Sequence, residues 1–192
     1  MLYRVLRFIV LIVYSCVMRI KVIGAENVPK TGGVILSGNH TSNNDPIILA
    51  VSQKRSIAFM AKDSIFKIPI FGFVLKCAGI FPVKRGTGDI GAVKKAIEIL
   101  KNGNMLSLFP EGKRNKTGEI LAPFQSGAAL IACKSDAVIV PVGIVGKYRL
   151  FSKITIIYNR PIDPKDYGEK PDIKLITNDL KEVILKTLEE YK

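Results

Sequence analysis

Short apolar runs alternate with amphipathic stretches along this chain of 192 residues. The apolar runs are bounded by glycine, proline or polar residues, a pattern typical of buried strands. The stretches between them repeat apolar residues three and four positions apart, which predicts helices with one buried face. We expect strands at 33–38, 56–61, 105–109, 137–145 and 153–158, and helices at 47–51, 90–101, 124–135 and 173–191.

The alternation of strands and helices predicts the fold class. It favours an α/β fold, in which helices cover a mixed, mostly parallel sheet. In such folds the functional loops usually follow the strands, at the carboxyl edge of the sheet. Residues 23–192 contain neither an obvious interdomain linker nor an internal repeat, so we expect them to form one catalytic domain.

The N-terminal segment 1–22 has a different character. Arg4 and Arg7 precede a mostly apolar run, and Arg19 and Lys21 follow it. The run is too short to span a bilayer, which takes about 20 residues in a helix. We therefore expect a retained N-terminal helix that lies in one membrane leaflet with its cations at the headgroups. A cleaved signal peptide and an ordinary core helix are the alternatives.

The formal net charge of +13 comes from 29 Lys and Arg residues against 16 Asp and Glu residues. Such an excess favours binding to a polyanionic surface, either nucleic acid or anionic lipid. Proteins that bind nucleic acid usually combine a basic stripe with aromatic residues, whereas this chain has no Trp and no recognition motif. We therefore expect an anionic membrane surface as the partner and no nucleic acid.

The cysteines and the single histidine argue against two classes of enzyme. Cys16, Cys77 and Cys133 are scattered without the spacing of zinc ligands, so no metal site is expected. No G-x-S-x-G sequence is present, which disfavours a serine hydrolase of that type. The cysteines also show no pairing pattern, so we interpret them as packing residues in a reducing compartment.

The only histidine, His40, directly follows the strand expected at 33–38. An imidazole can take and return a proton near neutral pH, so His40 is the sole histidine candidate for a general base. Pro46 suits the first turn of a helix, with Asp45 as its N-cap. If the loop turns the two side chains together, the Asp45 carboxylate can fix the imidazole tautomer. Taken alone, a helix cap and a polar loop residue explain the same pattern.

Two further segments carry cations directly after apolar residues, the first of them after the strand expected at 105–109. The loop that contains Glu111 and Gly112 continues into Lys113, Arg114 and Lys116, as an anion-binding site would need. The stretch 79–86 likewise leads from apolar residues into Lys84 and Arg85. A solvated basic turn and a surface loop are the alternatives for these two segments.

In this order, the segments resemble the sequence blocks of the glycerolipid acyltransferase family, specifically the 1-acyl-sn-glycerol-3-phosphate acyltransferases of bacterial phospholipid synthesis. Residues 39–45 are similar to the first block, N-H-x-S-x-x-D, and residues 109–115 to the third, F-P-E-G-T-R-S. Residues 79–85 resemble the second block and residues 140–142 the fourth, V-P-V. Lys113 and Asn115 depart from the third block, which usually has Thr and Ser there.

The resemblance implies a reaction and a role for each residue. His40 would deprotonate the sn-2 hydroxyl of 1-acyl-glycerol-3-phosphate, with Asp45 orienting the imidazole, to give phosphatidic acid without an acyl-enzyme. Arg85 and Arg114 would hold the phosphate, while Glu111 and Gly112 would shape the pocket. Lys62 and Lys84 are further candidates for phosphate contact or plain surface lysines.

The same resemblance sets the co-substrate and the place of action. The acyl donor would be acyl-CoA or acyl-carrier protein, with no cofactor, and the enzyme would work at the cytoplasmic face of the cell membrane. Two other functions remain open: acyl transfer to glycerol-3-phosphate, another lysophospholipid or a lyso-aminolipid, and anionic-lipid binding without turnover. The sequence does not decide the donor, the acyl chain length, the oxyanion donor or the oligomeric state.

Overall fold

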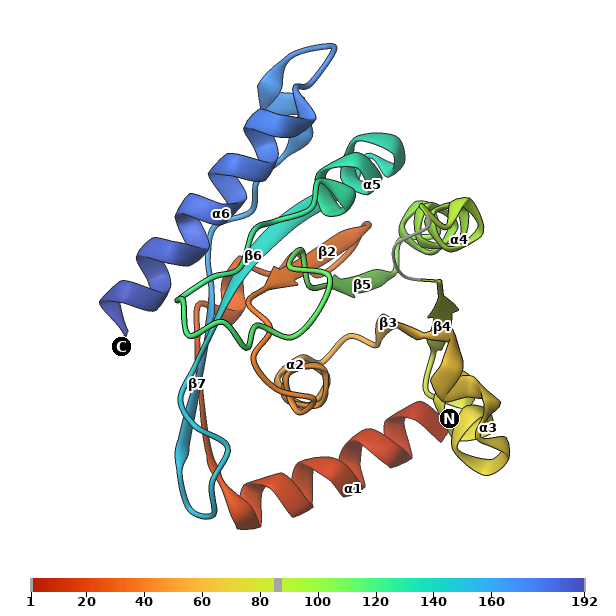
Figure 1. The fold of residues 1–192 in the computed structure, drawn as a ribbon, viewed down its shortest axis with the longest axis vertical. Helices are drawn as coiled ribbons and strands as arrows, with labels where there is room; N and C mark the ends of the chain where they lie inside the picture. Colours follow the sequence, from red (N-terminus) through yellow and green to blue (C-terminus); the bar gives the residue numbers. More distant parts are fainter. Residues whose placement is uncertain (1, 85–87, 192) are drawn as a thin grey trace.

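The computed structural model describes residues 2–84 and 88–191, and its described strands form one sheet between two layers of helices (Figure 1). The sheet order is β1-β7-β6-β2-β5-β3-β4. From β6 to β4 neighbouring strands are parallel, whereas β7 is antiparallel to β6 and β1 is parallel to β7. The expected mixed, mostly parallel sheet is confirmed. The strands are β1 Arg19–Ile23, β2 Val34–Gly38, β3 Ile57–Lys62, β4 Ile80–Val83, β5 Met105–Leu108, β6 Val138–Val145 and β7 Lys153–Tyr158.

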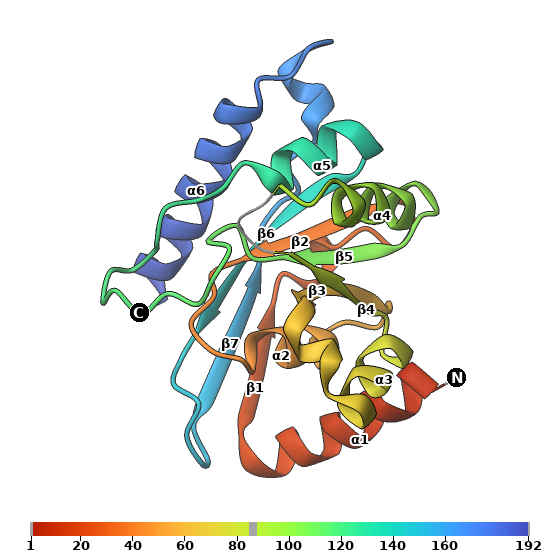
Figure 2. The same cartoon turned by 45° about the vertical axis from the view of Figure 1, so that its right-hand side comes forward.

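Helices cover both faces of the sheet, with α4, α5 and α6 on one face and α1 and α2 on the other (Figures 1 and 2). The helix α3 lies beside β4. The helices are α1 Leu2–Val17, α2 Asp45–Ser52, α3 Pro69–Cys77, α4 Ile90–Lys101, α5 Gly127–Ser135 and α6 Ile173–Glu190, with single 3₁₀ turns at Ala25–Asn27, Asp63–Lys67 and Pro164–Tyr167.

The strand β2 lies in the middle of the sheet, and all five of its residues are buried. Ile35 belongs to the core under α4, α5 and α6, whereas Leu36 belongs to the core under α2. A strand covered on both faces needs apolar side chains on both, which explains the uninterrupted apolar run before Ser37. His40 follows soon after the end of this central strand.

The N-terminal segment differs from the single helix expected there. The helix α1 ends at Val17, and Arg19–Ile23 forms the edge strand β1 against β7. The basic residues Arg19 and Lys21 alternate with Ile20 and Val22, a period of two that suits a strand with β-branched residues. These cations therefore belong to the sheet and not to the flank of the helix. Cys16, expected to pack inside, is exposed on α1.

The helix α1 is fastened to α2 by polar side chains. Arg7 donates from Nε and Nη2 to the carbonyl oxygens of Ala50 and Val51, at 2.8 and 3.1 Å. The Tyr14 hydroxyl donates to Oδ1 of Asn44 at 3.0 Å. Within residues 2–84 and 88–191, no helix is both long enough and apolar enough to cross a bilayer.

Candidate active site

The loops that follow β2, β5 and β6 meet at the carboxyl edge of the sheet. Because β2 pairs with β5 and β6, residues far apart in sequence reach this edge side by side: Ser37 is opposite Leu108, and Gly38 is opposite Val142. His40 follows β2 and Phe109 follows β5. The two rings stack, with centroids 4.2 Å apart and planes 22° apart.

His40 and Asp45 contact each other as their loop spacing allowed. His40 Nδ1 lies 2.9 Å from Oδ2 of Asp45, whose carboxylate is completely buried. The same oxygen accepts the backbone N–H groups of Thr41 and Ser42, each at 2.7 Å. Because these bonds fix the carboxylate toward the loop, Asp45 is not the N-cap expected from sequence. That position belongs to Asn44, and Asp45 begins α2.

The other carboxylate oxygen of Asp45 has a partner that sequence reasoning missed. The Tyr148 hydroxyl, from the loop after β6, donates to Oδ1 at 2.6 Å. Burial, followed by the negative charge of Asp45, raises the pKa of Tyr148 well above its usual value. The tyrosine therefore keeps its proton and remains a donor. Nothing in the local sequence around Asp45 signals a residue that lies 103 positions away.

The backbone of His40 is held by the loop that follows β5. Its N–H donates to Glu111 Oε1 at 2.7 Å, and its carbonyl accepts the N–H of Asn115 at 2.7 Å. The second oxygen of Glu111 accepts the N–H of Ala122 at 2.8 Å. Glu111 is buried, so both its oxygens are used in joining backbone segments. The Glu111 carboxylate therefore positions the candidate base through the backbone of His40.

The preceding residue, Asn39, adds a third connection. Its side-chain amide donates to the carbonyl of Ile144 at 3.0 Å and accepts the N–H of Ile144 at 2.8 Å. These two bonds fasten the start of the loop to β6. Asp45 is joined to Tyr148 on this same side, and Glu111 and Asn115 hold His40 from the loop after β5. The His40 loop is therefore held from both neighbouring strands.

Gly112 turns the loop after β5 toward the cavity. Its φ of +70° lies in the left-handed region, where residues with a side chain are strained. A Cβ at this position would lie 2.6 Å from Nε2 of Gln125, which lines the same cavity. The turn therefore favours glycine here, whereas the side chain of Gln125 would have to move to make room for a Cβ.

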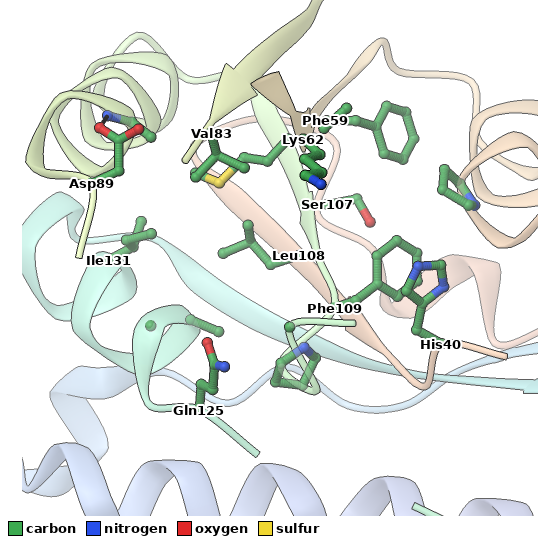
Figure 3. Close-up of a pocket in the computed structure, with 18 of the residues that line it drawn as sticks. His40, Phe59, Lys62, Val83, Asp89, Ser107, Leu108, Phe109, Gln125 and Ile131 are labelled. Carbon is green, nitrogen blue, oxygen red and sulfur yellow. Dashed lines mark hydrogen bonds between the residues drawn. The ribbon is translucent and has the colours of Figure 1, made fainter. Parts of the chain in front are cut away.

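A cavity of about 1110 Å³ opens beside His40 (Figure 3). Its walls combine apolar side chains from both sides of the sheet with two lysines, Lys62 and Lys84. Ser107 also lines it, and among the described residues its buried hydroxyl has no hydrogen-bond partner. The apolar lining includes Ile47, Phe59, Ile65, Leu75, Leu108 and Ile131. The cavity can therefore hold a ligand with a long apolar part and an anionic part.

The predicted phosphate-binding cations have different positions. Arg85 lies outside the described residues. Arg114 is exposed on the loop after β5 and is not part of the cavity wall. Lys62 and Lys84, the two lysines named as further candidates, do line the cavity. The structure thus brings His40, Asp45, Gly112 and these lysines together, whereas Arg114 is exposed outside the cavity wall.

Comparison with known proteins gives consistent matches. The family model described as Acyltransferase matches residues 19–145. The 1-acyl-sn-glycerol-3-phosphate acyltransferase of Borreliella burgdorferi is 34% identical over 144 residues, which cover 74% of this chain and 57% of that protein. The enzyme of the same name from Bacillus subtilis is 30% identical over 158 residues, which cover 79% of this chain and 78% of that one.

A solved structure is also similar. The crystal structure of the 1-acyl-sn-glycerophosphate acyltransferase PlsC from Thermotoga maritima matches with a TM-score of 0.75 and 28% identity, over 90% of this chain and 72% of that one. The chain spans only about half the length of some relatives, 57% of the Borreliella protein and 46% of a chloroplast enzyme of Brassica napus. The family model and the Bacillus relative nevertheless cover most of this sequence, and they show that the chain belongs to the acyltransferase family.

Proposed function

We propose that this protein transfers a fatty acyl group from an acyl thioester to the sn-2 hydroxyl of 1-acyl-glycerol-3-phosphate, giving phosphatidic acid. The observation that carries the proposal is the buried His40–Asp45 pair, in which His40 lines a cavity with apolar walls and lysines. The names of the Borreliella, Bacillus and Thermotoga relatives support this choice of acceptor.

The reaction needs one base and no enzyme nucleophile. Nδ1 of His40 is bonded to Asp45, which leaves Nε2 to take the proton of the acceptor hydroxyl as its oxygen attacks the thioester carbonyl. The C–S bond of the tetrahedral intermediate then breaks, and the imidazolium returns the proton to the thiolate. Asp45 stabilises the imidazolium between these two steps. No metal or organic cofactor takes part in this scheme.

The lining of the cavity supports one orientation of the substrate. Lys62 and Lys84 in the wall, together with Arg114 and with Arg85 carried over from the family resemblance, would hold the acceptor phosphate. The apolar walls would take an acyl chain, and the Ser107 hydroxyl would contact a polar atom of the ligand. Glu111 and Gly112 shape the site through the backbone. Acyl-CoA and acyl-carrier protein are both suitable donors.

We also propose that α1 anchors the protein to the cytoplasmic face of the cell membrane, where the soluble acyl donors are found. Phe8, Ile12 and Val13 are exposed on this helix, which supports a position in one leaflet. The division into an anchoring segment and a catalytic domain then falls after Val17, because β1 is part of the catalytic sheet.

The test supplies purified protein with 1-acyl-glycerol-3-phosphate and either acyl-CoA or acyl-carrier protein, and follows phosphatidic acid. His40→Ala should lower the rate by roughly 10²–10⁴-fold, the usual contribution of a general base, while vesicle binding is retained. Lys181→Ala, an exposed change on α6, is the control and should leave the rate unchanged.

Parallel assays with glycerol-3-phosphate and other lysophospholipids decide the acceptor. A faster reaction with one of these would replace the proposed acceptor but keep the chemistry. If no donor and acceptor pair gives product in lipid or detergent, the proposed activity is wrong, and a lipid-binding protein without turnover becomes the better interpretation.

A further inference from the structure

Large apolar side chains are exposed on three segments that are far apart in sequence. On α3, Ile70 is 83% exposed and Phe73 67% exposed. In the loop between β6 and β7, Leu150 is 67% exposed and Phe151 72% exposed. On α1, Phe8 is 62% exposed. Isolated exposed apolar residues are ordinary, but a contiguous apolar patch usually marks a binding surface.

The three segments share one edge of the molecule. In both Figure 1 and Figure 2, α1 runs along the lower edge, with the β6–β7 loop near its C-terminal end and α3 near its N-terminal end. The N–H of Phe151 donates to the carbonyl of Val17 at 2.6 Å, which fastens the loop to the end of α1. We call α1, α3 and residues 146–152 together the apolar edge.

The polarity of α1 is the reverse of a helix that faces water. Its polar residues Arg7 and Tyr14 bond inward to α2, whereas Phe8 and Ile12, four positions apart, are exposed on the outside. A helix on the surface of a water-soluble protein has its apolar stripe on the inner side and its polar residues on the outer side. The outer side of α1 therefore suits a hydrocarbon environment.

Phe151 shows that the loop is built to expose an aromatic ring. Its φ of +59° lies in the left-handed region, which is unusual for a bulky residue and costs backbone energy. The bond to Val17 holds it there with its ring mostly exposed. A glycine or asparagine would make the same turn with less strain, so water alone does not explain a phenylalanine at this position.

The segments of the apolar edge carry cations and no carboxylate side chains. They contain Arg4, Arg7, Lys76, Lys147 and Arg149 and none of the 16 Asp and Glu residues. Apolar side chains accompanied by cations match a surface of anionic headgroups over hydrocarbon. Two copies of such an edge would repel each other, which disfavours a second copy as the occupant.

We propose that the apolar edge contacts an anionic lipid bilayer as one unit, with α3 and the β6–β7 loop inserting beside α1. The inference rests on the proposed membrane function of α1 and extends it to two segments that the sequence did not indicate. It also orients the cavity, because α3 contributes Leu75 to the cavity wall and directs Ile70 and Phe73 outward. The helix α3 then separates the bilayer from the bound acyl chain.

The absence of Trp from the chain allows a direct test of insertion. Single substitutions Phe73→Trp and Phe151→Trp, with Leu175→Trp as the control, are mixed with vesicles of phosphatidylcholine and phosphatidylglycerol. Leu175 is also exposed but lies on α6, outside the apolar edge. We expect blue-shifted emission and quenching by brominated lipids at positions 73 and 151, and neither effect at 175.

Loss of contact is measured with Phe73→Glu and Phe151→Glu. Each should weaken binding to these vesicles roughly tenfold or more, the equivalent of losing one buried phenylalanine. Binding to vesicles of phosphatidylcholine alone should be weaker for every protein. Acyl transfer in detergent should be unchanged for both variants, so the readout separates membrane contact from the proposed activity.

Three results would overturn the proposal. Equal quenching at position 175 would indicate nonspecific adsorption. Quenching of a Phe8→Trp protein without quenching at 73 and 151 would leave α1 as the only anchor. Concentration-dependent dimers that Phe73→Glu dissociates in the absence of lipid would make a second copy the occupant. If the protein turns over no substrate but the quenching at positions 73 and 151 is as expected, the proposed activity is wrong and the proposed membrane contact of the apolar edge stands.

Discussion

Asp45 accepts hydrogen bonds from His40, Thr41, Ser42 and Tyr148 although its side chain is completely buried. A buried carboxylate remains charged only when its oxygens are satisfied in this way. The two backbone donors come with the loop itself. Tyr148 is the one donor that a single substitution removes without altering the loop, so it is the best means of testing how the pair works.

Tyr148→Phe removes the bond to Oδ1 and leaves one oxygen of Asp45 without a donor. Losing a hydrogen bond to a charged group costs about 1.5–3 kcal/mol, so we expect kcat to fall roughly ten- to a hundredfold. The KM for the acceptor should change little, because Tyr148 does not line the cavity. Steady-state kinetics of the purified variant give both values.

Tyr167→Phe is the matched control for this experiment. The Tyr167 hydroxyl donates to Oδ2 of Asp179 at 2.6 Å, and burial, followed by Asp179, raises its pKa to about 12. This pair also joins a tyrosine to an aspartate, but neither residue lines the cavity. Tyr167→Phe should therefore leave kcat unchanged. An equal loss of kcat in both variants would show that Tyr148 acts only through stability.

At the residue scale, the sequence predicted those parts of the site that lie within one loop. His40 and Asp45 are five positions apart, and their contact needed only a turn. The bracing role of Glu111 and the donor Tyr148 depend on which strands are neighbours, which a single sequence does not specify. Asp45 as an N-cap was wrong because its carboxylate has better donors in the loop than in the helix.

At the element scale, α4 shows how a cap sets a boundary. Asp89 accepts the N–H of Ala92 at 3.0 Å and the N–H of Lys84 at 2.9 Å, and the helix begins at Ile90. These backbone bonds, that of Lys84 first, lower the pKa of the Asp89 carboxyl below its usual value. The ionised side chain therefore stabilises the folded protein.

Asp89→Ala should lower the melting temperature at neutral pH. Because the folded pKa of Asp89 is depressed, its contribution is present above the pKa of an unfolded aspartate, near 3.9, and is lost as the pH falls through the lower folded value. The difference in melting temperature between the two proteins should therefore shrink toward pH 3. Thermal unfolding between pH 7 and pH 3 measures it. A difference that stays constant would contradict this role of the charge.

The elements predicted best are those with a complete local signal. The helix 90–101 and the strand 153–158 have the expected bounds, the first because of its cap and apolar spacing and the second because of its β-branched run. The edge strand β1 and the helix α3 were not predicted. β1 forms because β7 offers it a free edge, and α3 exposes apolar residues that periodicity normally assigns to a core.

At the scale of the whole molecule, the sheet separates two apolar cores. The core under α4, α5 and α6 supports the site, but its α6 side is remote from the cavity, because no residue of α6 lines that cavity. The core under α1 and α2 supports the helix that begins at Asp45. Stability and activity should therefore respond separately to changes at the α6 residues of the first core.

Ile184→Ala tests this separation. Ile184 is completely buried on α6, so its truncation should lower the free energy of unfolding by about 2–5 kcal/mol. Below the melting temperature, kcat and KM should equal those of the unmodified protein. Urea unfolding and initial rates at the same temperature measure the two effects, with the exposed change Leu175→Ala as the control. Loss of kcat in the folded variant would show that α6 couples to the site.

The α/β class was predictable from the alternation of elements, and the candidate chemistry from a few motifs at the ends of strands. The antiparallel pairing of β7 with β6 was not predicted, although the connection 146–152 is too short for the crossover that parallel neighbours need. Nor was the apolar edge, which arises only when three segments separated by more than forty positions are brought together.

The hydrogen bonds that hold His40 and Asp45 determine when the site can form during synthesis on the ribosome. Glu111 follows His40 by 71 positions, and Tyr148 follows Asp45 by 103. When the imidazole leaves the exit tunnel, Glu111 and Tyr148 have not yet been synthesised. The apolar side of α1 is already outside by then. With the proposed membrane role of α1, delivery to a bilayer precedes formation of the His40 site, and the nascent chain has no activity until β6 and the loop beyond it have emerged.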